Sequence, residues 1–73
     1  MTSTTIKIFI SLLSRERLTA KILADRFMVS TKTIYRAIDV LSTSGVPVYT
    51  LPGKNGGIFL DEGFDVRSLV KHK

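Results

Sequence analysis

Apolar side chains recur at helical spacing in three successive segments of the first 45 residues. The first segment carries such residues at i, i+3, i+4 and i+7, namely Ile6, Phe9, Ile10 and Leu13. This spacing is typical of one face of an α-helix, and Leu12 lies close to the same face. We therefore predict a helix over residues 4–14 that buries this face, followed by a connection over residues 15–18.

The second and third segments are separated by only three residues, 28–30. Thr19 is a good N-cap for the second helix, which should end near Phe27, and Ser30 is the N-cap of the third. Gly45 is the expected left-handed stop of the third helix. The predicted buried stripes are Ala20, Leu23, Ala24 and Phe27, helped by Ile22, and then Ile34, Ala37, Ile38 and Leu41.

The pattern becomes extended after the third helix. Residues 48–51 and 58–60 are β-prone runs joined by a turn-rich stretch, which predicts a β-hairpin with a long loop. Periodicity weakens after Leu60, and residues 64–70 suit one or two helical turns. The expected fold is mainly α (α+β), a winged helix-turn-helix with a three-helix bundle and a C-terminal hairpin wing. Residues 1–60 form its one domain, and residues 61–73 a tail or linker.

Charge and composition restrict the function. All of the formal net charge of +5 lies before Asp61, because residues 1–60 contain eight lysines and arginines and only three acidic residues. A basic folded part suits a polyanionic partner. Because the chain has no cysteine, disulfides and thiolate metal sites are excluded. The sequence contains no run of roughly 20 apolar residues and no secretory signal. We therefore expect a cytoplasmic location and no membrane partner.

The polar side of the third predicted helix has the residue types that read DNA. Lys32, Tyr35 and Arg36 fall opposite the buried stripe, with one acid, Asp39, near the end of the helix. Thr31 and Thr33 flank this side at the start of the helix. Arginine or lysine can bind guanine edges, and threonine can contact thymine methyl groups in the major groove. A merely solvated polar face is the alternative, but the exposed aromatic and the three-residue turn favour DNA.

Two further places suit contacts to the DNA backbone. The predicted hairpin tip carries Lys54 and Asn55 between glycines, and can bind phosphate or enter the minor groove. Asn55 could equally serve only a positive φ in the turn. Thr19 and Lys21, at the start of the second helix, can bind phosphate through free N–H groups and charge. For Thr19, helix capping alone is an equal alternative.

Catalytic chemistry has no sequence support. The chain contains no nucleophile–histidine pair, no metal-ligand spacing and no P-loop, and residues 53–57 do not follow a βα unit as a dinucleotide fingerprint would. We therefore expect no enzyme activity, no catalytic residues, no metal and no cofactor.

One long run of the chain resembles a known family. The residues LTAKILADRFMVSTKTIYRAIDVLSTSGVPVYTLPGKNGGIFL are similar to the N-terminal winged helix-turn-helix domain of DeoR-type and WYL-domain bacterial transcription regulators. The resemblance covers about residues 6–60, and its elements V-S, T-I-Y-R, G-V-P-V and G-G fall in register. The DNA-binding domain of the biotin repressor belongs to the same broad group.

The resemblance implies a role for particular residues. It maps Thr31, Lys32, Thr33, Tyr35 and Arg36 onto the recognition helix, with Lys32 in place of the usual arginine. It also maps Lys54 onto the wing tip. The family's aspartate after the arginine is here Ala37, so any orienting contact made by that carboxylate is absent and the docking angle on DNA is in question.

Together these features predict sequence-specific binding of double-stranded DNA by a transcriptional regulator, with repression as the expected outcome. A winged-helix module that binds protein is the alternative, as is the regulatory appendage of an enzyme. Family members usually add a C-terminal sensing or dimerising domain, so the chain is either an excised DNA-binding domain, which we expect, or a small stand-alone regulator. The oligomeric state stays open, with a homodimer through the tail or that absent domain as the common arrangement.

Overall fold

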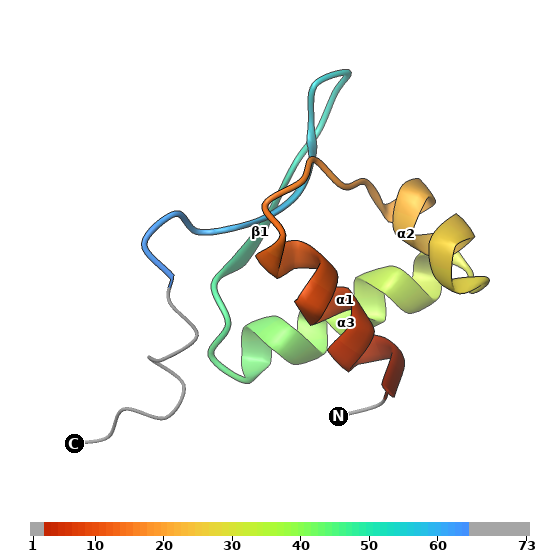
Figure 1. Ribbon diagram of the computed structural model, residues 1–73, viewed down its shortest axis with the longest axis horizontal. Coiled ribbons are helices and arrows are strands. Elements are labelled where there is room, and N and C mark those ends of the chain that lie inside the picture. The colour runs from red at the N-terminus through yellow and green to blue at the C-terminus, as the bar shows by residue number, and fades with distance from the viewer. Residues whose placement is uncertain (1–2, 65–73) are drawn as a thin grey trace.

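Three helices are followed by one antiparallel hairpin in the computed structural model of the chain, which describes residues 3–64. The elements are α1 (Ser3–Leu13), α2 (Ala20–Phe27), α3 (Thr31–Thr43), β1 (Val48–Leu51) and β2 (Gly57–Leu60), in the order drawn in Figure 1. The predicted mainly α, winged helix-turn-helix architecture is confirmed. The three predicted helices and the two predicted strands are present, with α1 starting and ending one residue earlier than expected.

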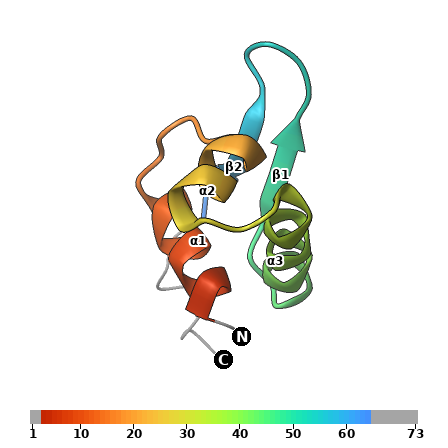
Figure 2. The ribbon, with the colours of Figure 1, turned by 90° about the vertical axis from the view of Figure 1, so that its right-hand side faces the viewer.

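The core draws on every element except β1. Its six largest fully buried side chains are Ile8, Leu18, Leu23, Ile34, Leu41 and Ile58. Figure 2 shows α1 and α2 on one side of this core and α3 on the other. Alanines at positions 20, 24 and 37 are also buried, and their small side chains permit close approach of the helices. The stripes predicted for α2 and α3 are therefore confirmed, apart from Phe27, which is partly buried, and Ile22, which is exposed.

The buried face of α1 differs from the one that the periodicity predicted. Thr5, Ile8 and Leu12 are buried, whereas Ile6 and Ile10 are 44% and 59% exposed. The predicted Phe9 and Leu13 are partly buried against the core. The prediction was wrong because apolar residues occupy nearly half the circumference of this helix, so that spacing alone could not choose the side that faces α3 and β2.

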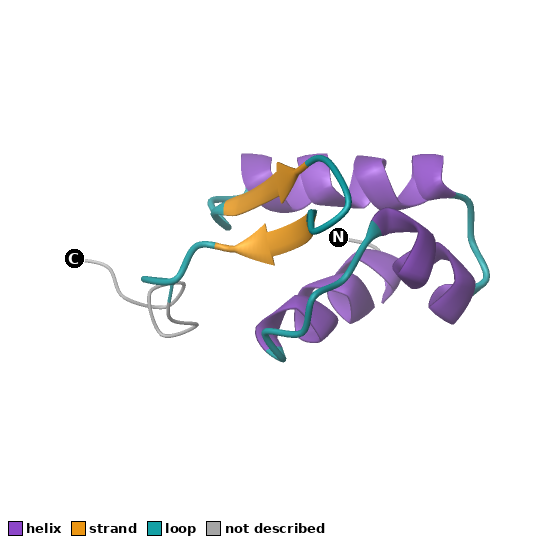
Figure 3. Ribbon diagram, turned by 90° about the horizontal axis from the view of Figure 1, so that it is seen from above, coloured by secondary structure: helices purple, strands orange, loops and turns teal. Residues whose placement is uncertain are grey.

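The hairpin packs through one strand. β1 and β2 pair from Val48 opposite Leu60 to Leu51 opposite Gly57. Most of β2 is buried and most of β1 is exposed. Leu18, in the connection between α1 and α2, forms a bridge with Ile58 on the other edge of β2. The hairpin therefore lies between α3 and this connection, as Figure 3 shows from above. We call residues 48–60 the wing and residues 52–56 the wing tip.

The end of α1 is tied to the chain that leaves the wing. The Arg15 guanidinium donates hydrogen bonds to the carbonyls of Leu60, Asp61 and Phe64 at 3.1–3.2 Å. The Phe64 ring also packs edge-on against Phe9, with ring centroids 6.2 Å apart. Phe64 thus helps to cover the core. The remainder of the helical segment predicted over residues 64–70 lies outside the described residues.

The ends of α2 and α3 differ in their left-handed residue. α3 ends in a Schellman motif, in which Gly45 has φ +100° and the Val46 amide donates to the Leu41 carbonyl at 3.0 Å. At the end of α2 the corresponding left-handed position is held by Met28, with φ 58°. Met28 is 90% exposed, so packing of its side chain does little to offset the strain of this left-handed backbone conformation.

Replacing Met28 with glycine should therefore stabilise the domain. Glycine adopts φ +58° without the steric conflict of a Cβ, and this gain exceeds the added entropy of the unfolded chain. We expect the free energy of unfolding in urea to rise by about 0.5–1 kcal/mol. Gly45→Ala is the matched opposite change at the end of α3 and should lower it. A Met28→Gly protein less stable than the parent would show that the methionine side chain makes a stabilising contact.

Candidate nucleic-acid interface

Side-chain caps fix the two helices that meet at the turn over residues 28–30. The Thr19 hydroxyl accepts a hydrogen bond from the Ile22 amide at 3.1 Å, and the Ser30 hydroxyl accepts one from the Thr33 amide at the same distance. Leu23 and Ile34, four residues after the caps, are fully buried. Each helix start is thus held by a polar cap on one side and by core packing on the other. These two anchors set the direction of α3.

The opposite side of α3 is open to solvent. Thr31, Lys32, Tyr35 and Arg36 are exposed, as predicted, with Tyr35 52% accessible. Within residues 3–64, neither Lys32 nor Arg36 takes part in an ion pair. Both cations are therefore available to an outside partner without first breaking an internal bond. Their role as DNA contacts stays a prediction.

Thr33 is more constrained than its neighbours. Thr33 is half-buried, and its hydroxyl oxygen lies 3.1 Å from the hydroxyl oxygen of Ser30, within hydrogen-bond distance. Since the Ser30 oxygen also caps the helix, Thr33 belongs to the local cap structure as well as to the edge of the exposed face. A base contact by Thr33 would have to share its hydroxyl with this cap.

The start of α2 offers a second set of polar groups. Thr19 is the N-cap, so the capping interpretation of this residue is confirmed, while a phosphate contact by it stays a prediction. Lys21 forms an i, i+4 ion pair with Asp25 at 3.4 Å, and both side chains are more than 70% exposed. Such a solvated pair contributes little to stability. The ammonium group can therefore exchange Asp25 for another anion.

The wing tip exposes the remaining predicted contacts, Lys54 and Asn55. The turn closes through a hydrogen bond from the Gly56 amide to the Gly53 carbonyl at 3.0 Å. Positive φ values in the hairpin fall on Gly53 and Gly57 and not on Asn55. The turn therefore does not need asparagine for a left-handed backbone, which removes the purely conformational explanation for this residue.

Arg17 is a residue of this region that sequence reasoning did not single out. Its guanidinium donates a hydrogen bond to the backbone carbonyl of Lys54, 37 residues away. No periodicity or motif marks such a contact, because the connection between α1 and α2 meets the wing only in the folded chain. Arg17 and Lys54 thus add positive charge where the wing meets the connection between α1 and α2.

The departure at Ala37 lies where α3 faces α1. Ala37 is only 4% exposed, and it lines a cleft together with Thr4 and Thr5 of the first turn of α1 and with Thr33 and Arg36 of α3. An aspartate at this position would place its carboxylate beside the N-terminus of α1, where the helix dipole favours negative charge. The missing contact would therefore have fixed α3 against α1, and through that packing the angle of α3.

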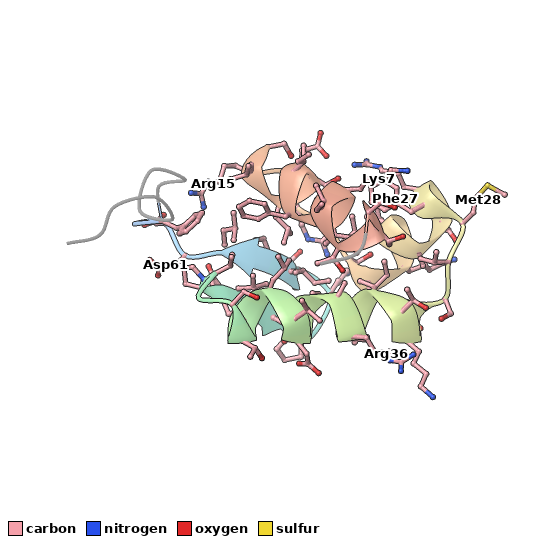
Figure 4. The ribbon with its side chains drawn as sticks, turned by 90° about the horizontal axis from the view of Figure 1, so that it is seen from below. Lys7, Arg15, Phe27, Met28, Arg36 and Asp61 are labelled. Carbon is pink, nitrogen blue, oxygen red and sulfur yellow. The ribbon has the colours of Figure 1, made fainter. Side chains whose placement is uncertain are left out.

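Charge is also present on the far side of the molecule. Figure 4 shows Lys7 on α1 pointing away from the side of α3 that carries Arg36. Lys7 is exposed and, within the described residues, makes no ion pair. It therefore provides a matched control for electrostatic effects on the α3 side. No helix among residues 3–64 has the length and apolar character needed to cross a membrane.

Comparisons with known proteins agree with this architecture. The sequence profile of the family described as "HTH domain" matches residues 4–59. A protein of Bacillus subtilis (strain 168), described as the uncharacterized HTH-type transcriptional regulator YobV, is 40% identical over 53 residues. That alignment covers 73% of this chain but only 17% of YobV, so the chain spans less than a fifth of the length of this relative. No solved structure gives a significant match.

Proposed function

This chain belongs to the HTH domain family, and on that premise we propose that it is the part of a transcriptional regulator that binds double-stranded DNA in a sequence-dependent manner. The observation that carries the proposal is the exposed face of α3, where Lys32 and Arg36 are free of internal ion pairs within the described residues. The opposite face of the same helix is anchored in the core.

In the proposed complex, α3 lies in the major groove and the wing lies on the flanking backbone. Lys32, Tyr35 and Arg36 face the base edges, and Thr31 and Thr33 lie at the N-terminal turn where recognition helices make most of their base contacts. Lys54 and Asn55 reach phosphate or the adjacent minor groove, and Thr19 and Lys21 contact phosphate at the start of α2. Base contacts provide specificity, whereas phosphate contacts provide register and most of the affinity.

The proposed biological outcome is repression by occupancy. A domain bound at an operator blocks access of RNA polymerase, which requires no catalytic step. Residues 1–60 form the DNA-binding unit in this proposal and residues 61–73 the tail or linker, with the cytoplasm as the site of action. A homodimer joined outside residues 1–60 would present two α3 helices to two half-sites.

Binding to duplex DNA should depend steeply on salt. About three to five phosphate contacts predict a log–log slope of affinity against salt concentration of roughly −3 to −4.5. Fluorescence anisotropy with a labelled duplex pool, followed by selection of the bound sequences, measures both the slope and the preferred site. Absence of duplex binding at low salt would contradict the proposal.

Protein binding is the second candidate function, and exposed apolar side chains favour it. Ile6 and Ile10 on α1, together with Tyr49 and Leu51 on β1, are each more than 40% exposed. Ile6 and Ile10 lie outside both the wing and the exposed face of α3, so a protein partner bound at these two residues would leave the proposed DNA contacts free. Salt-insensitive association with a protein, without duplex binding, would favour this function, including a role as the regulatory appendage of an enzyme.

A further inference from the structure

The base of the wing is fixed to the connection between α1 and α2. The Ile58 amide donates a hydrogen bond to the Leu18 carbonyl at 2.6 Å, which gives β2 a second neighbour besides β1. A Cβ at Gly57 would lie 2.6 Å from the same carbonyl, so only glycine permits this approach. Leu18 is 1% exposed, which makes this attachment part of the core.

The wing tip has a separate attachment through Arg17. Within the described part of the chain, the bond from Arg17 to the Lys54 carbonyl is the one hydrogen bond that joins residues 52–56 to a residue outside the hairpin. Arg17 and residues 52–55 of the tip are exposed, so core packing does not hold Lys54 in place if this bond is lost. The bond uses the backbone of Lys54 and leaves its ammonium group free.

We propose that Arg17 is a positioning residue for DNA binding, which holds the wing tip so that Lys54 and the N-terminus of α2 contact the DNA backbone together. The inference rests on the proposed function. Arg17 lies two residues before Thr19, the N-cap of α2, so the tip is attached to the same short segment that begins the helix. Losing the contact frees the tip and makes the phosphate contact of Lys54 costly in entropy, because the tip must then be ordered on binding.

The first test needs no DNA. In Arg17→Gln, backbone ¹⁵N relaxation should show the order parameters of the Lys54 and Asn55 amides falling from the rigid range of about 0.85 toward about 0.6. The amides of α3 should not change, because its caps and core packing are untouched. Lys7→Gln, which removes one cation from the far side of the molecule, should leave both regions as in the parent. An unchanged wing tip in Arg17→Gln would overturn the inference whether or not the chain binds DNA.

The second test is a double-mutant cycle on DNA affinity. Lys54→Ala keeps the carbonyl that Arg17 binds, so the two substitutions remove different groups. In the parent, Lys54→Ala should reduce the magnitude of the salt slope by about 0.9, the value of one phosphate contact. In the Arg17→Gln background the same change should have less than half that effect, because the free tip no longer delivers Lys54 to the backbone.

The outcomes separate the two proposals. Non-additive slopes together with a mobile tip in Arg17→Gln support the positioning role. Additive slopes, with each substitution removing its own contact, would overturn it and make Arg17 an independent phosphate contact. A parent chain that binds no duplex would instead remove the proposed function and, with it, the role of Arg17 in DNA binding, even if the tip is mobile in Arg17→Gln.

Discussion

Arg36→Ala should weaken binding to the preferred duplex by about 1–3 kcal/mol, which is a loss of roughly 5–150-fold in affinity. Arg36 is exposed on α3 and, within the described residues, makes no side-chain hydrogen bond or ion pair that alanine would remove. A guanidinium that bonds a guanine edge in two places is the commonest specific contact in the major groove, and alanine provides neither bond. The loss should be accompanied by relaxed preference at one base pair.

The measurement is anisotropy at one salt concentration, on the selected site and on its single base-pair variants. Lys7→Ala is the matched control, since it also removes an exposed cation but from the side of the molecule opposite Arg36 (Figure 4). It should reduce affinity far less and leave the base preference unchanged. If Arg36→Ala weakens all duplexes equally, the residue contacts phosphate and does not read a base.

Ile8→Ala should destabilise the domain by about 2–5 kcal/mol, the range for removing a large aliphatic side chain from a closely packed core. Ile8 is 0% exposed and shares the core with residues of α2, α3 and β2. A domain of this size has a free energy of unfolding of only several kcal/mol. A large fraction of the Ile8→Ala protein should therefore be unfolded at 25 °C, as measured by urea titration of the circular dichroism signal.

Ile10→Ala is the matched control on the same helix. Its side chain is 59% exposed, so the loss should stay within about 0.5 kcal/mol. The periodicity of the sequence predicted the opposite ranking, because it placed Ile10 on the buried stripe. A larger loss for Ile10→Ala than for Ile8→Ala would show that the face predicted from spacing is the one that packs, or that Ile10 is covered by a partner in solution.

Local rules were sufficient for the elements with unambiguous caps and breakers. Ser30 before α3 and Gly45 after it bracket the helix in the structure as the sequence predicted, and Thr19 caps α2. These signals act between residues a few positions apart, so they can be read without knowing the fold. The exposed face of α3 followed from the same periodicity, since a well-defined buried stripe leaves one opposite side.

Sequence reasoning was insufficient where a choice depended on distant neighbours. The broad apolar arc of α1 allowed more than one buried face, and Met28 gave no local sign of a left-handed backbone. Asn55 was suited to positive φ, yet Gly53 and Gly57 are the residues that adopt it. The contact of Arg17 joins residues 37 positions apart and follows no spacing rule.

The sequence by itself determined the three helices, the three-residue turn, the hairpin and the polar face of α3, because caps, glycines and helical periodicity are local properties. Only the tertiary structure decided that Ile8 and Leu12, and not Ile6 and Ile10, enter the core, since that depends on the surfaces that α3 and β2 present to α1. It also decided that Ala37 faces the start of α1 and that Arg17 holds the wing tip. Both contacts join segments that are distant in the sequence and become neighbours only in the folded chain, so no short-range sequence pattern predicts them.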